Sequence, residues 1–68
     1  MKNRITQLRK ERHMTQQDLA DLLGVTRQTI ISLEGGRYNP SIILAFKLAK
    51  VFDMHIEEIF IYEEEKES

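Results

Sequence analysis

The stretch from Gln16 to Glu34 constrains the fold of this chain more than any other part of it. Large apolar residues recur there at helical spacing, with a small Ala20 and a single Gly24 between them. This pattern is typical of two short helices joined by a tight turn. Ala20 allows a close crossing of the two helices, and Gly24 can adopt the left-handed conformation that ends the first one. The apolar positions are Leu19, Leu23, Val25, Ile30 and Leu33.

Signals for helix starts and stops divide the first half of the chain into three helices. Apolar spacing predicts a first helix over about residues 4–12. The second helix starts after Thr15, whose hydroxyl can accept a hydrogen bond from the amide of Asp18, and it runs to about residue 23. Thr26 is a favourable N-cap for a third helix, which the glycines at 35–36 end.

A turn at Asn39-Pro40 separates these helices from a fourth, because the residue before a proline disfavours the helical conformation. Its cap is either Ser41 or Asn39, the latter with Pro40 in the first helical position. The helix extends to about Phe52, and we expect its inward face to consist of Ile42, Ala45, Leu48, Ala49 and Phe52.

The C-terminal part offers two interpretations. A short fifth helix is expected over about residues 56–60, and the β-branched and aromatic run at 59–62 could instead pass into a strand that pairs with Met1–Asn3. We expect residues 63–68 to be frayed. The predicted fold is therefore an all-α bundle of about five short helices, with a possible two-stranded pairing of the chain ends.

Size and cysteine content limit how such a fold is stabilised. Sixty-eight residues make one domain, 1–68, and a chain of this size buries only roughly 60% of its unfolded surface. There is no cysteine, so neither a disulfide nor a cysteine-ligated metal supplements the core, although a second subunit could. The spacing of His13 and His55 suggests no metal site.

No apolar run reaches the roughly 18 residues of a membrane span and no signal peptide is evident, so we expect a cytoplasmic protein without a membrane contact.

The net charge of −1 conceals a division of charge along the chain. Residues 1–53 carry nine basic and five acidic side chains, whereas residues 54–68 carry one basic and six acidic ones. A basic body with an acidic tail is compatible with binding a polyanion, because the local field steers it more than total charge does. An ordinary mixed surface with a solubilising tail is the alternative.

Enzyme chemistry and cofactors are not indicated. The chain has no Ser/His/Asp or Cys/His arrangement, no glycine-rich phosphate loop and no metal cluster. The paired acids at 57–58 and 63–65 lie near a terminus, with no pocket implied.

The chain from Leu8 to Phe60 resembles the phage repressor/Cro-type (XRE-like) helix-turn-helix family, and most closely its small stand-alone dimeric members of the cytolysin-repressor kind. The resemblance implies the lambda repressor-like fold, with the helix-turn-helix at 16–34, and a transcriptional regulator that binds double-stranded DNA. The matching residues are Leu8-Arg9, Thr15-Gln16, Leu19-Ala20, Gly24-Val25, Thr26, Ile30, Leu33-Glu34, Pro40-Ser41, Leu48-Ala49 and Ile59-Phe60.

In this family the N-terminal residues of the third helix meet base edges in the major groove. Arg27 and Gln28 occupy these positions here, and Ser32, one turn later on the same face, could reach a base or a phosphate. Arg can bond to both acceptors of guanine, and Gln can bond to the adenine edge. The alternative is that these side chains only solvate an exposed helix. Ile31 departs from the family, which usually has a polar residue there.

The resemblance also implies contacts that hold the DNA without reading it. The expected phosphate-contacting or positioning residues are Gln16, Thr26, Thr29, Arg37, Tyr38 and Asn39, and Lys10 and Arg12 are possible flanking contacts. In the family, the residue at the position of Gln16 often also supports a base-reading Gln of the third helix. Arg9 and Glu34 are expected to form a structural ion pair between the first and third helices.

The resemblance implies a homodimer. In dimers of this type the two recognition helices lie about 34 Å apart and match two half-sites one helical turn apart. The expected interface, within a dimerisation and acidic segment at 54–68, consists of Ile56, Ile59, Phe60, Ile61 and Tyr62. A protein with no effector domain most simply represses by occupying its operator. Two alternatives are an antitoxin-like DNA-binding module that neutralises a protein partner, and a helix-turn-helix used only for protein contacts.

Overall fold

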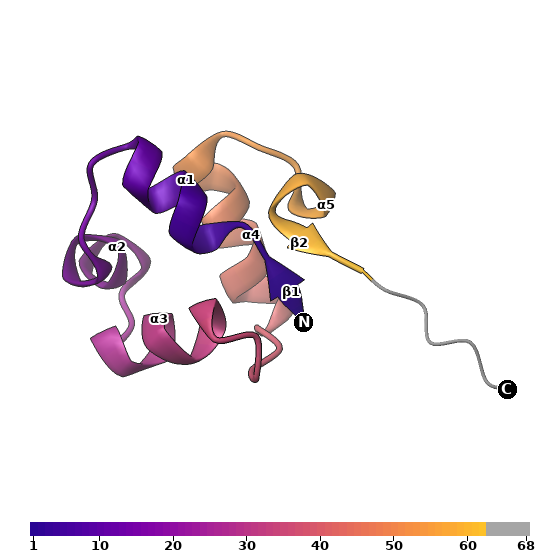
Figure 1. Ribbon diagram of the computed structural model, residues 1–68, viewed down its shortest axis with the longest axis horizontal. Helices are drawn as coiled ribbons and strands as arrows, with labels where there is room; N and C mark the ends of the chain where they lie inside the picture. Colours follow the sequence, from indigo (N-terminus) through magenta and orange to yellow (C-terminus); the bar gives the residue numbers. More distant parts are fainter. Residues whose placement is uncertain (63–68) are drawn as a thin grey trace, which may run out of the picture.

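The computed structural model describes residues 1–62, which form five helices and two short strands (Figure 1). This confirms the expected all-α fold, and it also confirms the strand pairing of the chain ends. The expected fraying of residues 63–68, and the part of the acidic segment that they form, lie outside the described residues. The elements are β1 (Lys2–Asn3), α1 (Ile5–Glu11), α2 (Gln16–Leu23), α3 (Arg27–Glu34), α4 (Ile42–Phe52), α5 (Ile56–Ile59) and β2 (Phe60–Ile61).

Local capping explains where the central helices begin and end. The Thr15 hydroxyl accepts from the Asp18 amide at 3.0 Å and the Asp18 carboxylate accepts from the Thr15 amide at 2.9 Å, which is a complete capping box for α2. Gly24 then ends α2 with φ of 71°, a left-handed conformation that glycine adopts without strain. Thr26 caps α3 by accepting from the Thr29 amide at 3.2 Å.

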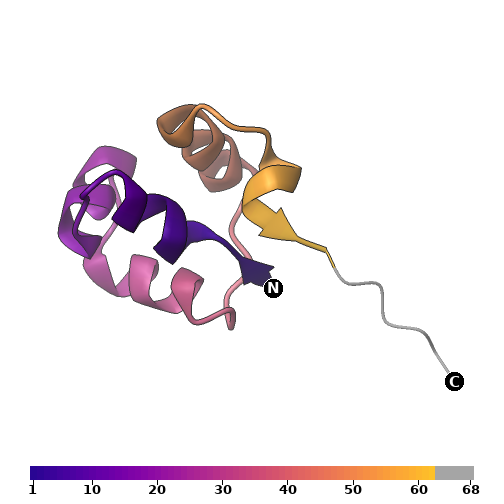
Figure 2. The same ribbon diagram turned by 45° about the horizontal axis from the view of Figure 1, so that its top comes forward.

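One hydrophobic core joins all five helices. Ala20 is fully buried between α2 and α3, where its small side chain permits the close crossing. Figure 2 shows α1 and α3 running alongside each other, with α4 and α5 covering the remaining side of the core. The fully buried large side chains are Phe52, Ile5, Leu19, Leu23, Ile30, Leu33, Leu48 and Ile59.

Helix α4 corrects one sequence-based expectation. Ile42 was expected to face inward, but it is 71% exposed, and Leu44 is buried instead. The sequence of α4 is apolar on almost every side, so helical spacing alone does not select its inward face. Packing selects the face defined by Leu44, Ala45 and Leu48. Ile42 therefore joins Ile43 and Phe46, which are 66% and 59% exposed, in what we call the outer α4 surface.

The two chain ends meet in a small antiparallel sheet. Lys2 pairs with Ile61 and Asn3 with Phe60, and the amide of Arg4 donates to the Ile59 carbonyl at 2.8 Å. This arrangement corrects part of the expected dimer interface. Ile59 is fully buried and Phe60 is 7% exposed, because both complete the chain's own core beneath the sheet.

Asn3 also ties β1 to the end of α3. Its side-chain amide donates to the Leu33 carbonyl at 2.7 Å, and its side-chain oxygen accepts from the Ile5 amide at 3.1 Å. The C-terminal end of α3 is thus fixed to β1. No described helix is long and apolar enough to cross a membrane.

Candidate nucleic-acid interface

The outward side of α3 is polar and accessible. Its underside is anchored by Ile30 and Leu33, both fully buried. On the other side, Arg27 and Gln28 are exposed and Ser32 is half-buried. These are the three side chains that the sequence assigns to base readout, so their placement leaves them free to meet a ligand.

Ile31 interrupts this polar side. It is 38% exposed, so it neither enters the core nor stands fully in solvent. Scattered exposed apolar residues are ordinary on protein surfaces, and the described contacts assign Ile31 no specific partner.

An ion pair fixes α3 to α1. Arg9 Nε lies 2.7 Å from Glu34 Oε2, and a second guanidinium nitrogen lies 3.3 Å from Oε1, so the contact is bidentate. Only 10% of the Arg9 side chain and 9% of the Glu34 side chain are exposed to solvent. Arg9 also donates to the Met14 carbonyl at 2.8 Å, which connects the α1–α2 turn to the pair. The Arg9–Glu34 pair therefore joins α1 to α3 and holds the turn that leads into α2.

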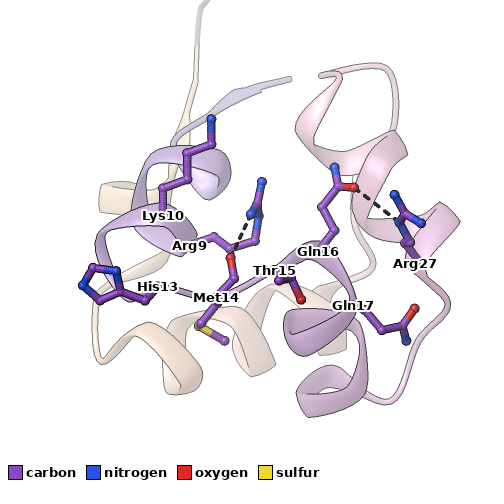
Figure 3. Close-up of a pocket in the computed structure, with 8 residues that line it drawn as sticks. All are labelled: Arg9, Lys10, His13, Met14, Thr15, Gln16, Gln17 and Arg27. Carbon is purple, nitrogen blue, oxygen red and sulfur yellow. Dashed lines mark hydrogen bonds between the residues drawn. The ribbon is translucent and has the colours of Figure 1, made fainter.

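Gln16 extends this ion pair to the N-terminus of α3. Its side-chain amide donates to Glu34 Oε1 at 3.1 Å, and its side-chain oxygen lies 3.5 Å from Arg27 Nε. Figure 3 shows the side chains of Gln16 and Arg27 turned toward each other across the gap between α2 and α3. Four polar residues from three helices thus form one continuous network.

The network sets the ionisation of Glu34. Burial raises the pKa of Glu34, but hydrogen bonds from Arg9, Gln16 and Thr6, together with the positive charge of Arg9, outweigh this effect. The net result is a pKa below the ordinary value, so the carboxylate stays charged at neutral pH.

A broad polar depression lies beside this network, with a volume of about 670 Å³. It is open to solvent and rimmed by basic groups from α1 and from the start of α3 (Figure 3). Gln16 and Gln17, the first two residues of α2, line it, and helix N-termini favour anions. The lining residues are Arg9, Lys10, His13, Met14, Thr15, Gln16, Gln17 and Arg27.

The other expected phosphate contacts lie along α3 and the loop that follows it. Thr26 is exposed at the start of α3, and Thr29 is half-buried one turn later. Arg37 and Asn39 are exposed, whereas Tyr38 packs partly against the core. The structure therefore places expected contacts at both ends of α3.

Arg12 has a role that sequence reasoning missed. One guanidinium nitrogen donates to the Leu8 carbonyl at 3.2 Å and another donates to the Phe52 carbonyl at 2.9 Å. The guanidinium also lies 5.0 Å from the centre of the Phe52 ring, a cation–π distance. Arg12 thus caps the C-terminus of α4 rather than extending toward a flanking phosphate. A basic residue following a helix gives no sequence signal for so distant a partner.

The geometry agrees with the comparisons to known proteins. The sequence pattern of the helix-turn-helix family matches residues 5–59, which is most of the chain. The chain belongs to the XRE-like helix-turn-helix family. It is therefore a helix-turn-helix transcriptional regulator, and this family is a DNA-binding class without enzymatic activity.

Similar regulators occur in archaea and bacteria. An uncharacterized HTH-type transcriptional regulator of Methanocaldococcus jannaschii is 54% identical over 66 residues, which cover 97% of this chain and all of that protein. The HTH-type transcriptional regulator AnsR of Bacillus subtilis is 35% identical over 66 residues, covering 97% of this chain and 57% of AnsR.

A solved structure resembles the regulator closely. The restriction-modification controller protein C.AhdI of Aeromonas hydrophila superimposes with a TM-score of 0.75 at 33% identity. The match covers 84% of this chain and 86% of C.AhdI. A transcriptional regulator from Listeria innocua gives a TM-score of 0.80 at 26% identity, over 97% of this chain and 65% of that one.

Proposed function

We propose that this regulator binds a specific double-stranded DNA operator with the polar side of α3 in the major groove. The observation that carries the proposal is the contrast within α3. Arg27 and Gln28 are exposed, while Ile30 and Leu33 on the opposite side are fully buried. A helix anchored in this way can enter a groove without disturbing the core.

Each exposed side chain suits a base edge. Arg27 can donate two hydrogen bonds to the O6 and N7 atoms of guanine, and Gln28 can bond to the N6 and N7 atoms of adenine. Ser32 lies further along the same side, where its hydroxyl can meet a base or a phosphate. Gln16, Thr26, Thr29, Arg37, Tyr38 and Asn39 are assigned to positioning along the sugar–phosphate backbone.

The functional unit is proposed to be a homodimer on a two-fold-symmetric operator. Of the interface expected from the sequence, three residues keep surface for a partner. Ile56 is partly buried, Ile61 is 38% exposed and Tyr62 is 76% exposed. With Met1 and Arg4 they border a hollow of about 600 Å³. We call Ile56, Ile61 and Tyr62 the C-terminal apolar surface.

The outer α4 surface is proposed to extend this interface. Ile42 and Phe46 are one helical turn apart and therefore share a side of α4. Ala49 continues the same stripe, and it borders the junction where α5 packs against α4. A second subunit that covers the C-terminal apolar surface and this stripe would remove Tyr62, Ile42 and Phe46, which are 59–76% exposed, from water.

The regulator is proposed to act in the cytoplasm as a repressor, because a small DNA-binding dimer blocks transcription simply by occupying a promoter. A reporter driven by the bound promoter should fall when the protein is supplied. A rise in reporter output on adding the protein would instead indicate activation.

The test of DNA binding is a salt titration of the dissociation constant on duplex DNA. Phosphate contacts give a log–log slope of about −0.9 for each phosphate neutralised, so we expect a steep decrease in affinity with salt. A flat response, or no binding at low salt, would favour a helix-turn-helix used only for protein contacts. Co-purification of a stoichiometric small protein would favour the antitoxin-like alternative.

A further inference from the structure

Glu34 lies at the opposite end of α3 from Arg27, yet a single bridging side chain connects the two. The two residues are seven positions apart, which corresponds to about 10 Å along the helix. Gln16 spans this distance from α2, with its nitrogen on Glu34 and its oxygen toward Arg27. This connection affects how the Arg27 guanidinium is oriented toward DNA, which the base-reading proposal does not specify.

The chemistry of the groups fixes the direction of the connection. An ionised carboxylate can only accept hydrogen bonds, so the amide nitrogen of Gln16 must face Glu34. The carbonyl oxygen of the same amide then faces outward, toward α3. Arg27 Nε is the donor that meets it, at 3.5 Å. A rotated amide would instead present two N–H donors to a guanidinium, which has no acceptor.

Glu34 is itself held in one position. Arg9 contacts both carboxylate oxygens, at 2.7 and 3.3 Å, and the pair is almost fully buried. A carboxylate fixed in this way gives Gln16 a defined anchor, whereas an exposed one would change rotamer freely. The fixed position of Glu34 is therefore passed on through Gln16 to Arg27, the exposed first residue of α3.

The contact also selects which nitrogens of Arg27 remain for a ligand. With Nε turned toward Gln16, the two terminal nitrogens have no hydrogen-bond partner among residues 1–62. These two nitrogens form the end of the guanidinium fork, which can meet the two acceptors of guanine together.

We propose that Glu34 is a positioning residue for base recognition, acting through the amide of Gln16 to orient Arg27 for guanine. This inference rests on the proposed function, because it assumes that Arg27 reads a base. It assigns Glu34 a part in sequence discrimination in addition to its structural pairing with Arg9. Glu34 itself does not touch DNA in this account.

The experiment measures discrimination rather than affinity. An operator is first obtained by selection from random duplexes with the wild-type protein. Dissociation constants are then measured for that operator and for one with the Arg27-contacted base pair exchanged. The ratio of the two constants is compared for wild type, Glu34→Gln, Gln16→Met, Arg27→Ala and the double variant Glu34→Gln/Arg27→Ala. Circular dichroism at the assay temperature establishes that each variant is folded.

The expected wild-type ratio is about tenfold to hundredfold, the range of a good bidentate pair. Glu34→Gln should lower it by about threefold to tenfold, as is usual for substitutions along a coupled network. In the Arg27→Ala background, Glu34→Gln should leave the ratio unchanged, because the Arg27 side chain that Glu34 is proposed to orient is absent. A general loss of structure or of phosphate contacts would weaken both duplexes equally and leave the ratio unchanged.

Two results would overturn the proposal while leaving DNA recognition by α3 intact. In one, Glu34→Gln weakens binding to both duplexes by the same factor. In the other, it changes the ratio equally with and without Arg27. If Glu34→Gln does not fold, Gln16→Met decides, because it removes the bridge and leaves the Arg9–Glu34 pair in place. A lowered ratio for Gln16→Met supports the connection, and an unchanged ratio refutes it. An Arg27→Ala ratio equal to that of wild type would instead refute the base-reading proposal itself.

Discussion

Helices α3 and α4 each turn one side away from the core, and the two exposed sides have opposite chemistry. That of α3 carries the exposed Gln28 and Arg27, whose Nε lies 3.5 Å from the side-chain oxygen of Gln16. Gln16 in turn donates to Glu34 of the buried ion pair. That of α4 carries Ile42, Ile43 and Phe46, which are 59–71% exposed. Polar groups with a prepared hydrogen-bond network suit a polar ligand, whereas exposed apolar groups suit another apolar surface. We therefore propose that the two sides serve different partners, with DNA at α3 and a second subunit at α4.

The largest expected effect comes from removing the support behind α3. Arg9→Ala leaves the Glu34 carboxylate buried without its cation, and breaking a buried pair in this way typically costs about 3 kcal/mol or more. We expect a decrease of that size in the free energy of unfolding measured with urea. Lys10→Ala, at the exposed neighbouring position, is the matched control and should change stability by less than about 0.5 kcal/mol. Equal effects of the two substitutions would show that the pair does not stabilise the fold.

The outer α4 surface is tested by Phe46→Lys. Because Phe46 is mostly exposed, folding of the subunit should be little affected, while burial in a dimer is worth about 1.5–3 kcal/mol. We therefore expect the dimer dissociation constant, measured by analytical ultracentrifugation, to rise about tenfold to hundredfold. Leu22→Lys changes a residue of α2 that is 62% exposed and serves as the control. If both variants dimerise like wild type, α4 is not part of the interface.

The caps of the two helices provide a smaller and more symmetric test. Thr26 caps α3 and Ser41 caps α4, each accepting from the amide three residues later. Replacing either by Ala should lower the free energy of unfolding by about 1 kcal/mol. Only Thr26→Ala should also weaken DNA binding beyond this change in stability, since Thr26 borders the proposed groove contact. Equal losses of DNA affinity in the two variants would contradict the assignment of recognition to α3.

The smallest effect expected is a dependence of stability on pH. The folded-state pKa of Glu34 lies below its ordinary value of about 4.5, so the unfolded chain binds more protons between the two values. The stabilisation from this group is complete above about pH 4.5 and is lost as the pH falls through the folded-state pKa.

Urea unfolding of wild type and Glu34→Gln from pH 6 to pH 3 measures this contribution. We expect the wild-type stability to decrease more steeply in the acidic range. Some slope remains in the variant, because hydrogen bonds from the backbone and side chain of Thr15 also lower the pKa of Asp18. Parallel curves for the two proteins would show that the Glu34 carboxylate gains nothing from its partners on folding.

The same contrast explains what could be predicted from the sequence. Around α2 and α3 the signals are local. Thr15 with Asp18, Gly24 and Thr26 each determine a helix end through contacts within four residues, so the boundaries followed from the sequence. In α4 nearly every position is apolar, and only tertiary packing distinguishes the buried Leu44 from the exposed Ile42. The expected interface was too large for a related reason, since Ile59 and Phe60 were needed by the chain's own core.

The polar contacts likewise divide into those expected from the sequence and those that only the structure shows. The resemblance implied the pairing of Arg9 with Glu34 and support from Gln16 for a base-reading residue of the third helix. It implied neither the Arg12 contact with Phe52 nor the Gln16 contact with Glu34. These contacts join residues that are up to 40 positions apart, and no local pattern records them.

The most direct test of the central claim is to select bound duplexes from a random pool with the wild type, Arg27→Ala and Arg37→Ala. The account predicts a two-fold-symmetric sequence for the wild type, with half-sites about one helical turn apart. Arg27→Ala should lose preference at a single base pair of each half-site, whereas Arg37→Ala should select the same sequence more weakly. If the wild type enriches no sequence, or if both variants lose affinity without any change in base preference, the polar side of α3 does not read DNA.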